Sequence, residues 1–281
     1  MVFKILDVSK YQLKIDYKAV AEEVDGVIIR CGITYWGKQD KGIDPCFEQH
    51  YAGFKAAGVP VGVYYYSAAD SVEQALAEAD KCLEIIKGKQ FELPIYYDVE
   101  NNERQGALSK AALTAIVEAF CDKVEKQGYF VGYYSYTAWL QSKFDTAYLS
   151  AKYTLWKADY RVFYDKKISC DMHQYTSSGS VAGINGRVDL SNCYRDFPSI
   201  IKKAGLNGYS KPVASVAKPV ADSLKVGDTV KVLNPVQYDN GKAFRCWFST
   251  YTVKQINGNR VVIAKAGVTV AAVHKDNLKK V

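Results

Sequence analysis

Two patterns of hydrophobic residues divide this chain into successive strands and helices. Short apolar runs rich in β-branched and aromatic residues are typical of buried strands, and apolar residues spaced three and four apart are typical of helices. The two patterns alternate over the first 135 residues, which predicts five β/α units with a parallel sheet inside and helices outside. The predicted strands are 2–8, 26–32, 59–67, 94–100 and 130–135, and the predicted helices are 17–23, 47–57, 71–87 and 110–127.

The alternation stops after residue 135. Tyr153–Trp156, Met172–Tyr175 and Val188–Leu190 have the composition of short strands joined by loops, with little helix predicted before Phe197–Lys203. The first part of the chain is therefore predicted to be α/β, an irregular TIM-like (β/α) barrel with five β/α units and a β-rich closing segment.

The last quarter of the chain, from residue 206 onward, differs in composition. Residues 206–223 are rich in Gly, Pro, Ala and Ser without an apolar period, which is typical of a linker. Short alternating strands follow at 224–233, 252–256, 260–264, 268–274 and near Leu278, and the second and third flank the hairpin sequence Asn257-Gly258-Asn259. We therefore predict a barrel at 1–205, a linker at 206–223 and a small all-β barrel at 224–281.

The positive charge lies in this tail. The first 205 residues hold 25 Lys and Arg against 26 Asp and Glu, whereas Leu206–Val281 holds 12 against 4, a net charge of +8. A basic β-barrel could bind nucleic acid, but the Lys and Arg are scattered singly, so we predict no nucleic acid partner.

Membrane, secretion and disulfide signals are weak in this sequence. No stretch approaches the roughly 20 apolar residues of a membrane span. Residues 1–7 are too short and charged too early for a secretory signal, so we expect no signal peptide and synthesis in the cytoplasm. The seven cysteines are odd in number and form no C-x-x-C pair, which favours reduced thiols over disulfides or a zinc site.

The most informative motif is Asp98-Val99-Glu100, which closes a predicted strand. Residues two apart on a strand face the same side, with Cα atoms roughly 6.6 Å apart. Such a separation suits two carboxyl groups that share the work at a glycosidic bond. The alternative is that the two acids are exposed to solvent at the end of a strand and take no part in a reaction.

Barrel topology predicts that further acids join this pair. The loops at the carboxyl ends of the strands form one rim, where Asp7, Asp159 and Asp189 are also placed. Aromatic residues share these ends, and their rings suit the C–H faces of sugars, although each could instead pack in the core. The predicted catalytic residues are Asp7, Asp98, Glu100 and Asp189, and the predicted substrate contacts are Arg30, Tyr64, Tyr66, Tyr133, Trp156, Asp159 and Tyr175.

Several blocks together resemble glycoside hydrolase family 25, the lysozyme-type muramidases of phage endolysins and bacterial autolysins. They include Asp7-Val8-Ser9-Lys10-Tyr11-Gln12, Asp98-Val99-Glu100, Trp156-Lys157-Ala158-Asp159-Tyr160, His173-Gln174-Tyr175 and Val188-Asp189-Leu190-Ser191. The resemblance covers about the first 195 residues in the family's order. Tyr65, where many relatives have His, and Lys157 depart from the pattern without touching the four acids.

The resemblance implies cleavage of the β-1,4 bond between N-acetylmuramic acid and N-acetylglucosamine in peptidoglycan, without cofactor or metal. By position, Glu100 matches the general acid, and Asp98 the acid that assists the substrate's acetamido group. Asp7 and Asp189 match the other two acids of the site. Burial and mutual repulsion of these carboxyl groups would keep Glu100 protonated.

The tail resembles a Src-homology-3-type wall-binding module, for which anionic wall polymers are the expected partner; a solubilising appendage is the alternative. The whole chain is thus expected to be an endolysin released from the host cytoplasm onto the wall. Two other functions remain open: a silent glycan-binding protein on the same barrel, and a hydrolase dependent on Mg or Ca.

Overall fold

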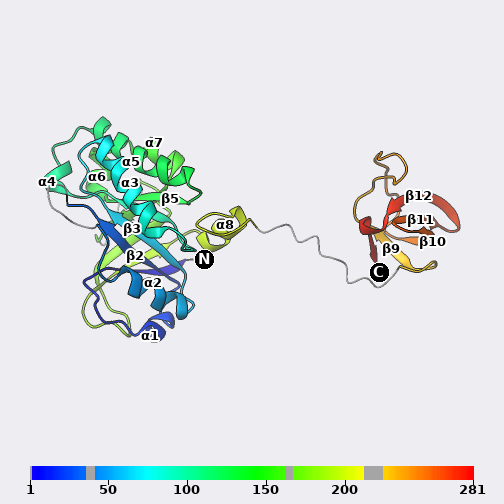
Figure 1. Cartoon of the computed structure of the whole chain (residues 1–281), viewed down its shortest axis with the longest axis horizontal. Helices are drawn as coiled ribbons and strands as arrows, with labels where there is room; N and C mark the ends of the chain where they lie inside the picture. The colour runs from blue at the N-terminus through cyan, green and yellow to red at the C-terminus, as the bar shows by residue number, and fades with distance from the viewer. Residues whose placement is uncertain (1, 36–41, 162–166, 212–223) are drawn as a thin grey trace. The chain divides into compact units, whose positions relative to one another are not determined.

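Eight strands pair side by side and close into a barrel in the computed structural model, which describes residues 2–35, 42–161, 167–211 and 224–281 (Figure 1). Neighbouring strands run parallel from the first to the seventh, and the eighth is antiparallel to both of its neighbours. The strands are β1 (Phe3–Val8), β2 (Gly26–Ile33), β3 (Val61–Tyr66), β4 (Ile95–Asp98), β5 (Val131–Tyr136), β6 (Thr154–Ala158), β7 (Met172–Gly179) and β8 (Val188–Cys193). The predicted TIM-like barrel is confirmed.

Helices follow the strands and cover the outside of the barrel, where α3 and α5 lie side by side (Figure 1). Side-chain caps set several of their starts: Ser71 Oγ accepts from Gln74 N, and Ser109 Oγ accepts from Ala112 N. The helices are α1 (Tyr17–Ala21), α2 (Phe47–Ala56), α3 (Val72–Ile86), α4 (Asn102–Gln105), α5 (Lys110–Lys126), α6 (Thr137–Ser142), α7 (Thr146–Lys152) and α8 (Phe197–Ala204).

The prediction of little helix between residue 135 and Phe197 is wrong. Helices α6 and α7, of six and seven residues, follow β5 directly. Both are too short to show a clear apolar period, although Asp145 caps α7 by accepting from Tyr148 N.

The barrel wall separates two apolar clusters because side chains alternate across each strand. Tyr96, Tyr134 and Trp156 fill the barrel interior, while Tyr97 and Tyr133 face the helices. The Tyr97 ring stacks on Phe120 of α5, with ring centroids 3.8 Å apart and 7° between planes. On β4 this alternation places Asp98 inside the barrel, on the same side as Tyr96.

The barrel unit extends past its predicted end at residue 205. Asn207 is fully buried, donates to Leu93 O at 2.9 Å and accepts from Phe130 N at 2.6 Å. The Tyr209 hydroxyl donates to the Glu92 carboxylate. The start of the predicted linker, 206–211, thus continues the barrel domain, and its remainder, 212–223, lies outside the described residues.

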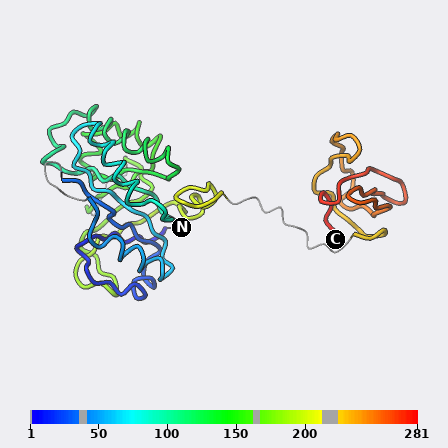
Figure 2. The backbone as a smooth tube through the Cα atoms, viewed as in Figure 1, coloured from blue at the N-terminus to red at the C-terminus, as the bar shows by residue number. Residues whose placement is uncertain are grey.

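The C-terminal unit is an antiparallel sheet of five strands in the order β12-β11-β10-β9-β13, seen in orange and red in Figure 2. Asn257 pairs with Arg260 around a left-handed Gly258, as the predicted hairpin requires. The strands are β9 (Thr229–Val232), β10 (Tyr251–Asn257), β11 (Arg260–Lys265), β12 (Val268–His274) and β13 (Leu278–Lys280).

Two chemical features of the whole chain follow from this fold. All seven cysteines carry free thiols. Within the described ranges, none of the helices has both the length and the apolar character needed to cross a bilayer.

Candidate active site

Four carboxyl groups line one cleft of about 370 Å³ at the carboxyl ends of the parallel strands. Asp7 and Asp98 lie at the ends of β1 and β4, Glu100 follows two residues later, and Asp189 is the second residue of β8. Because β8 runs antiparallel, its start reaches the rim where the other strands finish. The lining residues are Asp7, Val8, Ser9, Tyr11, Gln12, Arg30, Ile33, Tyr35, Tyr64, Tyr66, Asp98, Glu100, Asn101 and Asp189.

Asp7 and Asp189 form a pair across neighbouring strands, since they are register partners between β1 and β8. Burial and the charge of Asp189 raise the pKa of Asp7 well above its ordinary value, and the hydrogen bond between the two side chains adds to this shift. Burial also raises the pKa of Asp189, while the same hydrogen bond lowers it. The pKa values of both carboxyl groups are therefore raised, and the hydrogen bond from Gln174 opposes the shift at Asp7.

Asp98 and Glu100 differ in their surroundings. Burial raises the pKa of Glu100 to about 7, with a further contribution from the charge of Asp189. Asp98 is 4% exposed; burial and the charges of Glu100 and Asp7 raise its pKa, which Arg30 opposes. Among the described residues, the Asp98 Oδ1 atom has no hydrogen-bond partner. The site thus combines a glutamic acid whose pKa is raised to about 7 with a buried carboxyl oxygen that has no hydrogen-bond partner.

Arg30 and two tyrosines from β3 form part of the cleft wall. Arg30 Nε and Nη2 contact Asp44 Oδ2 at 2.7 and 2.6 Å, so Arg30 is held in an ion pair while it faces the cleft. Tyr64 is the register partner of Arg30, and Tyr66 that of Asp98. These three predicted substrate contacts therefore lie beside the acids.

The other four predicted contacts are placed elsewhere, and none is among the residues that line the cleft. Tyr133 faces the helices, where its hydroxyl contacts Ser150 Oγ at 2.8 Å. Trp156 is 2% exposed inside the barrel and donates from Nε1 to Ser191 Oγ at 3.0 Å. Asp159 pairs with Arg161, and Tyr175 packs against the larger apolar cluster.

Gln174 contacts one of the site acids, although the sequence analysis did not select it. Its Nε2 donates to Asp7 Oδ2 at 2.9 Å, and its Oε1 accepts from the hydroxyls of Tyr134 at 2.8 Å and Tyr160 at 2.6 Å. Gln174 therefore orients the Asp7 carboxyl. The sequence offered one indication of Gln174: it is a polar residue within a predicted strand, and its side chain points to the face opposite those of His173 and Tyr175.

A metal site is not evident from the side-chain arrangement. Across the part of the chain that the structure describes, no three His, Cys, Asp or Glu side chains are grouped so that they could hold an ion.

An α/β barrel with a cleft of carboxyl groups at its strand ends is an architecture used by glycoside hydrolases. Residues 6–184 match the model of the glycosyl hydrolases family 25, which is more than half of the chain. The chain belongs to this family of glycoside hydrolases.

Two curated relatives match part of the chain. The autolytic lysozyme of Clostridium acetobutylicum is 30% identical over 194 residues, covering 66% of this chain and 54% of that protein. The D-alanyl-L-alanine endopeptidase of Streptococcus phage B30 is 30% identical over 169 residues, covering 54% of this chain and 37% of that protein. The chain thus spans about half or less of these relatives' lengths.

A solved structure shows the same fold. The modular autolysin LytC of Streptococcus pneumoniae, in complex with a synthetic peptidoglycan ligand, is 31% identical with a TM-score of 0.59. The match covers 69% of this chain and 47% of that one.

Proposed function

We propose that this protein is an N-acetylmuramidase that cleaves the β-1,4 bond between N-acetylmuramic acid and N-acetylglucosamine in bacterial peptidoglycan. The observation that carries the proposal is the cleft in which burial raises the pKa of Glu100 to about 7, beside the unpaired Asp98 Oδ1. The autolytic lysozyme and the peptidoglycan-bound autolysin among its relatives support this substrate.

The reaction assigns different work to the two acids. Glu100 donates its proton to the glycosidic oxygen, which leaves with the electron pair of the breaking C1–O bond. Asp98 Oδ1 accepts from the N–H of the 2-acetamido group, so that the acetamido oxygen faces the anomeric carbon and attacks it. The resulting oxazolinium cation is stabilised by the Asp98 carboxylate, and water then opens it with Glu100 acting as the base.

The pKa of Glu100 predicts the alkaline limit of activity. The acid must be protonated at the start of the cycle, and that form is lost as the pH rises through about 7. We expect kcat/KM on soluble glycan fragments to fall about tenfold per pH unit above this value. A pH–rate series from about pH 5 to about pH 9 measures this, and a constant rate up to about pH 9 would contradict it.

Clearing of purified walls from several Gram-positive hosts tests the proposed function. We expect clearing that a chelator leaves unchanged. Loss of clearing with chelator and its return with Mg or Ca would favour a metal-dependent hydrolase instead. Sedimentation with walls in the absence of any clearing would favour the other alternative, a glycan-binding protein without catalysis.

We also propose that the C-terminal unit binds anionic polymers of the wall. Its charge supports this, and so does an exposed loop in which Trp247 is 70% and Phe248 is 50% exposed. The Arg245 guanidinium lies 4.3 Å from the centre of the Trp247 ring. Aromatic faces next to a cation suit a polymer that carries both sugar or polyol units and negative charge.

Truncation separates catalysis from wall binding. A chain that ends at Lys211 keeps Asn207 and Tyr209 in the barrel, so it should cleave soluble glycan at near the full rate. On whole walls it should be slower and less salt-sensitive than the full chain, because the Debye length falls to about 3 Å at 1 M salt. Rates on both substrates across a salt series measure this.

A point variant provides the control for the truncation. Trp247→Ala in the full chain should weaken sedimentation with walls and leave the soluble rate unchanged. If the truncated and full chains lyse and sediment with walls equally, the C-terminal unit does not target the enzyme.

The cellular role that we propose is that of an endolysin, made in the cytoplasm of a host and released to the wall. Two relatives support it: the enzyme of phage B30, and the CTP1L endolysin, whose solved structure is 25% identical with a TM-score of 0.61.

A further inference from the structure

A buried polar chain lies behind the segment that carries Asp98 and Glu100. Its members are Ser67 at the end of β3, Glu78 on α3, Tyr97 on β4 and Gln105 on α4; all four are fully buried. We call these four residues the Ser67 network. None of them lines the cleft.

Hydrogen bonds run through the network in one direction. Gln105 Nε2 donates to Ser67 Oγ at 2.9 Å, Ser67 Oγ donates to the Tyr97 hydroxyl at 2.8 Å, and that hydroxyl donates to Glu78 Oε2 at 2.5 Å. The other carboxylate oxygen, Glu78 Oε1, accepts from Ala68 N at 3.0 Å. Each hydroxyl is thus both donor and acceptor, which strengthens the neighbouring bonds, and the chain ends on a carboxylate.

The network holds both ends of the acid-bearing segment. Tyr97 directly precedes Asp98, and its position on the outer face of β4 fixes Asp98 on the inner face. Asn101 directly follows Glu100, and its N–H donates to Gln105 Oε1 at 3.1 Å. Asp98-Val99-Glu100 therefore lies between one anchor that depends on Glu78 and one that depends on Gln105.

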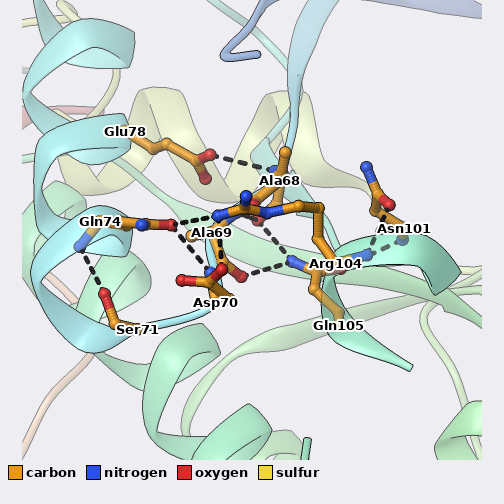
Figure 3. A network of polar contacts seen from close by, with 10 residues as sticks. Ala68, Ala69, Asp70, Ser71, Gln74, Glu78, Asn101, Arg104 and Gln105 are labelled. Atoms are coloured by element: carbon orange, nitrogen blue, oxygen red, sulfur yellow. Dashed lines mark hydrogen bonds and ion pairs between the residues drawn. The ribbon is translucent and has the colours of Figure 1, made fainter. Parts of the chain in front are cut away.

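A second set of contacts joins the same loops nearer the surface (Figure 3). Arg104 forms an ion pair with Asp70, donates from Nε to Ala68 O at 3.3 Å and from Nη2 to Gln74 Oε1 at 3.3 Å. Asn101 Oδ1 in turn accepts from Arg104 N at 3.2 Å. Helix α4 is thus attached to the loop after β3 on two sides, one buried and one half-exposed.

Burial of a carboxylate and an amide costs free energy, which their hydrogen bonds must offset. The hydrogen bonds described above join Glu78 and Gln105 to β4 and to the loops that follow β3 and β4, on either side of the acids. We propose that Glu78 and Gln105 are positioning residues that fix Asp98 and Glu100 in the cleft, a role that rests on the proposed function of these acids. Loss of either anchor would let water reach Glu100. It would also let the Glu100 carboxyl group move away from the glycosidic oxygen of the substrate.

Glu92 provides a matched control for Glu78. It is also a buried glutamate, and its carboxylate likewise accepts from a backbone N–H, that of Val61 at 3.1 Å, and from a tyrosine hydroxyl, that of Tyr209. It differs in that it also pairs with Lys55 Nζ at 2.5 Å. Its contacts involve the start of β3 and the segment after α8, away from the acids. Glu78→Gln and Glu92→Gln therefore both remove the charge of a buried carboxylate that accepts from a backbone N–H and a tyrosine hydroxyl, at opposite ends of the barrel strands, and Glu92→Gln also removes the ion pair with Lys55.

The experiment compares Glu78→Gln, Gln105→Met and Glu92→Gln in the full chain on soluble glycan fragments. We expect the first two to lower kcat about 10- to 100-fold with little change in KM, as for a displaced catalytic group. Their alkaline limit should also move to lower pH, because a better-solvated Glu100 has a lower pKa. Glu92→Gln should keep the wild-type kcat and alkaline limit, even if its melting temperature falls as much as those of the Glu78 and Gln105 variants.

The outcomes separate this inference from the proposed function. If Glu78→Gln and Gln105→Met match Glu92→Gln in kcat and in pH limit, the positioning role is wrong. If one of the two fails to fold, as judged by circular dichroism, the other decides. Glu100→Gln, measured beside them, tests the acid itself: its inactivity with unaffected Glu78 and Gln105 variants overturns the positioning role alone.

Discussion

Glu100→Gln should abolish wall lysis while the barrel stays folded and the chain still sediments with walls. The amide has nearly the shape of the carboxyl group but no proton to donate. General acid catalysis is typically worth about 100- to 10,000-fold in rate, so residual turnover should be below about one hundredth of wild type. Rates on walls and on soluble glycan, with circular dichroism of the variant, give the measurement.

The matched control is Glu103→Gln, an exposed acid on α4 in the same stretch of chain. It removes the same charge without entering the cleft, and it should retain the wild-type rate. Turnover of Glu100→Gln above a tenth of wild type would remove Glu100 from the mechanism.

Asp98→Asn should also be severely impaired, about 100-fold or more in kcat. The amide keeps an oxygen that can accept from the acetamido N–H, so substrate binding should survive. It lacks the negative charge that balances the oxazolinium cation, and such preorganised charge in a buried site is a large contribution to catalysis. Measured kcat and KM on soluble glycan distinguish loss of rate from loss of binding.

The role of Asp98 has a second consequence, which concerns covalent intermediates. If the acetamido oxygen is the nucleophile, no sugar should accumulate on Asp98 when wild-type protein is incubated with slow fluorosugar substrates. Detection of that adduct by mass spectrometry would replace the substrate-assisted route with an ordinary double displacement.

The sequence predicted the barrel and the convergence of the four acids because both follow from simple geometry. Strands with acids at their carboxyl ends bring those acids to one rim, whatever the details of packing. Asp189 reaches the same rim because β8 is antiparallel, a direction that its apolar pattern could not reveal.

The side of the barrel wall on which each aromatic side chain lies could not be predicted in the same way. A barrel strand is covered on both sides, so both of its faces are apolar. The sequence therefore does not show which residues of the strand point into the barrel and which point toward the helices. Tyr133 and Tyr134 are both aromatic, and only the second points into the barrel. The same ambiguity favoured Tyr175 over its neighbour Gln174, which contacts Asp7.

Composition also misplaced the end of the barrel domain. Gly205, Asn207 and Gly208 all have left-handed backbone angles, which suit tight turns as well as linkers. Here they bring the fully buried side chain of Asn207 to the backbones of Leu93 and Phe130. A tertiary contact of this kind has no local signature in sequence.

The bond that the enzyme breaks is the most direct test of the proposed activity. Purified peptidoglycan digested by the full chain, then reduced and analysed by mass spectrometry, should yield fragments that end in reduced N-acetylmuramic acid, with no new free amino groups. The Glu100→Gln protein should yield none of these ends. Reduced N-acetylglucosamine ends, or new amino groups such as an endopeptidase releases, would contradict the muramidase proposal.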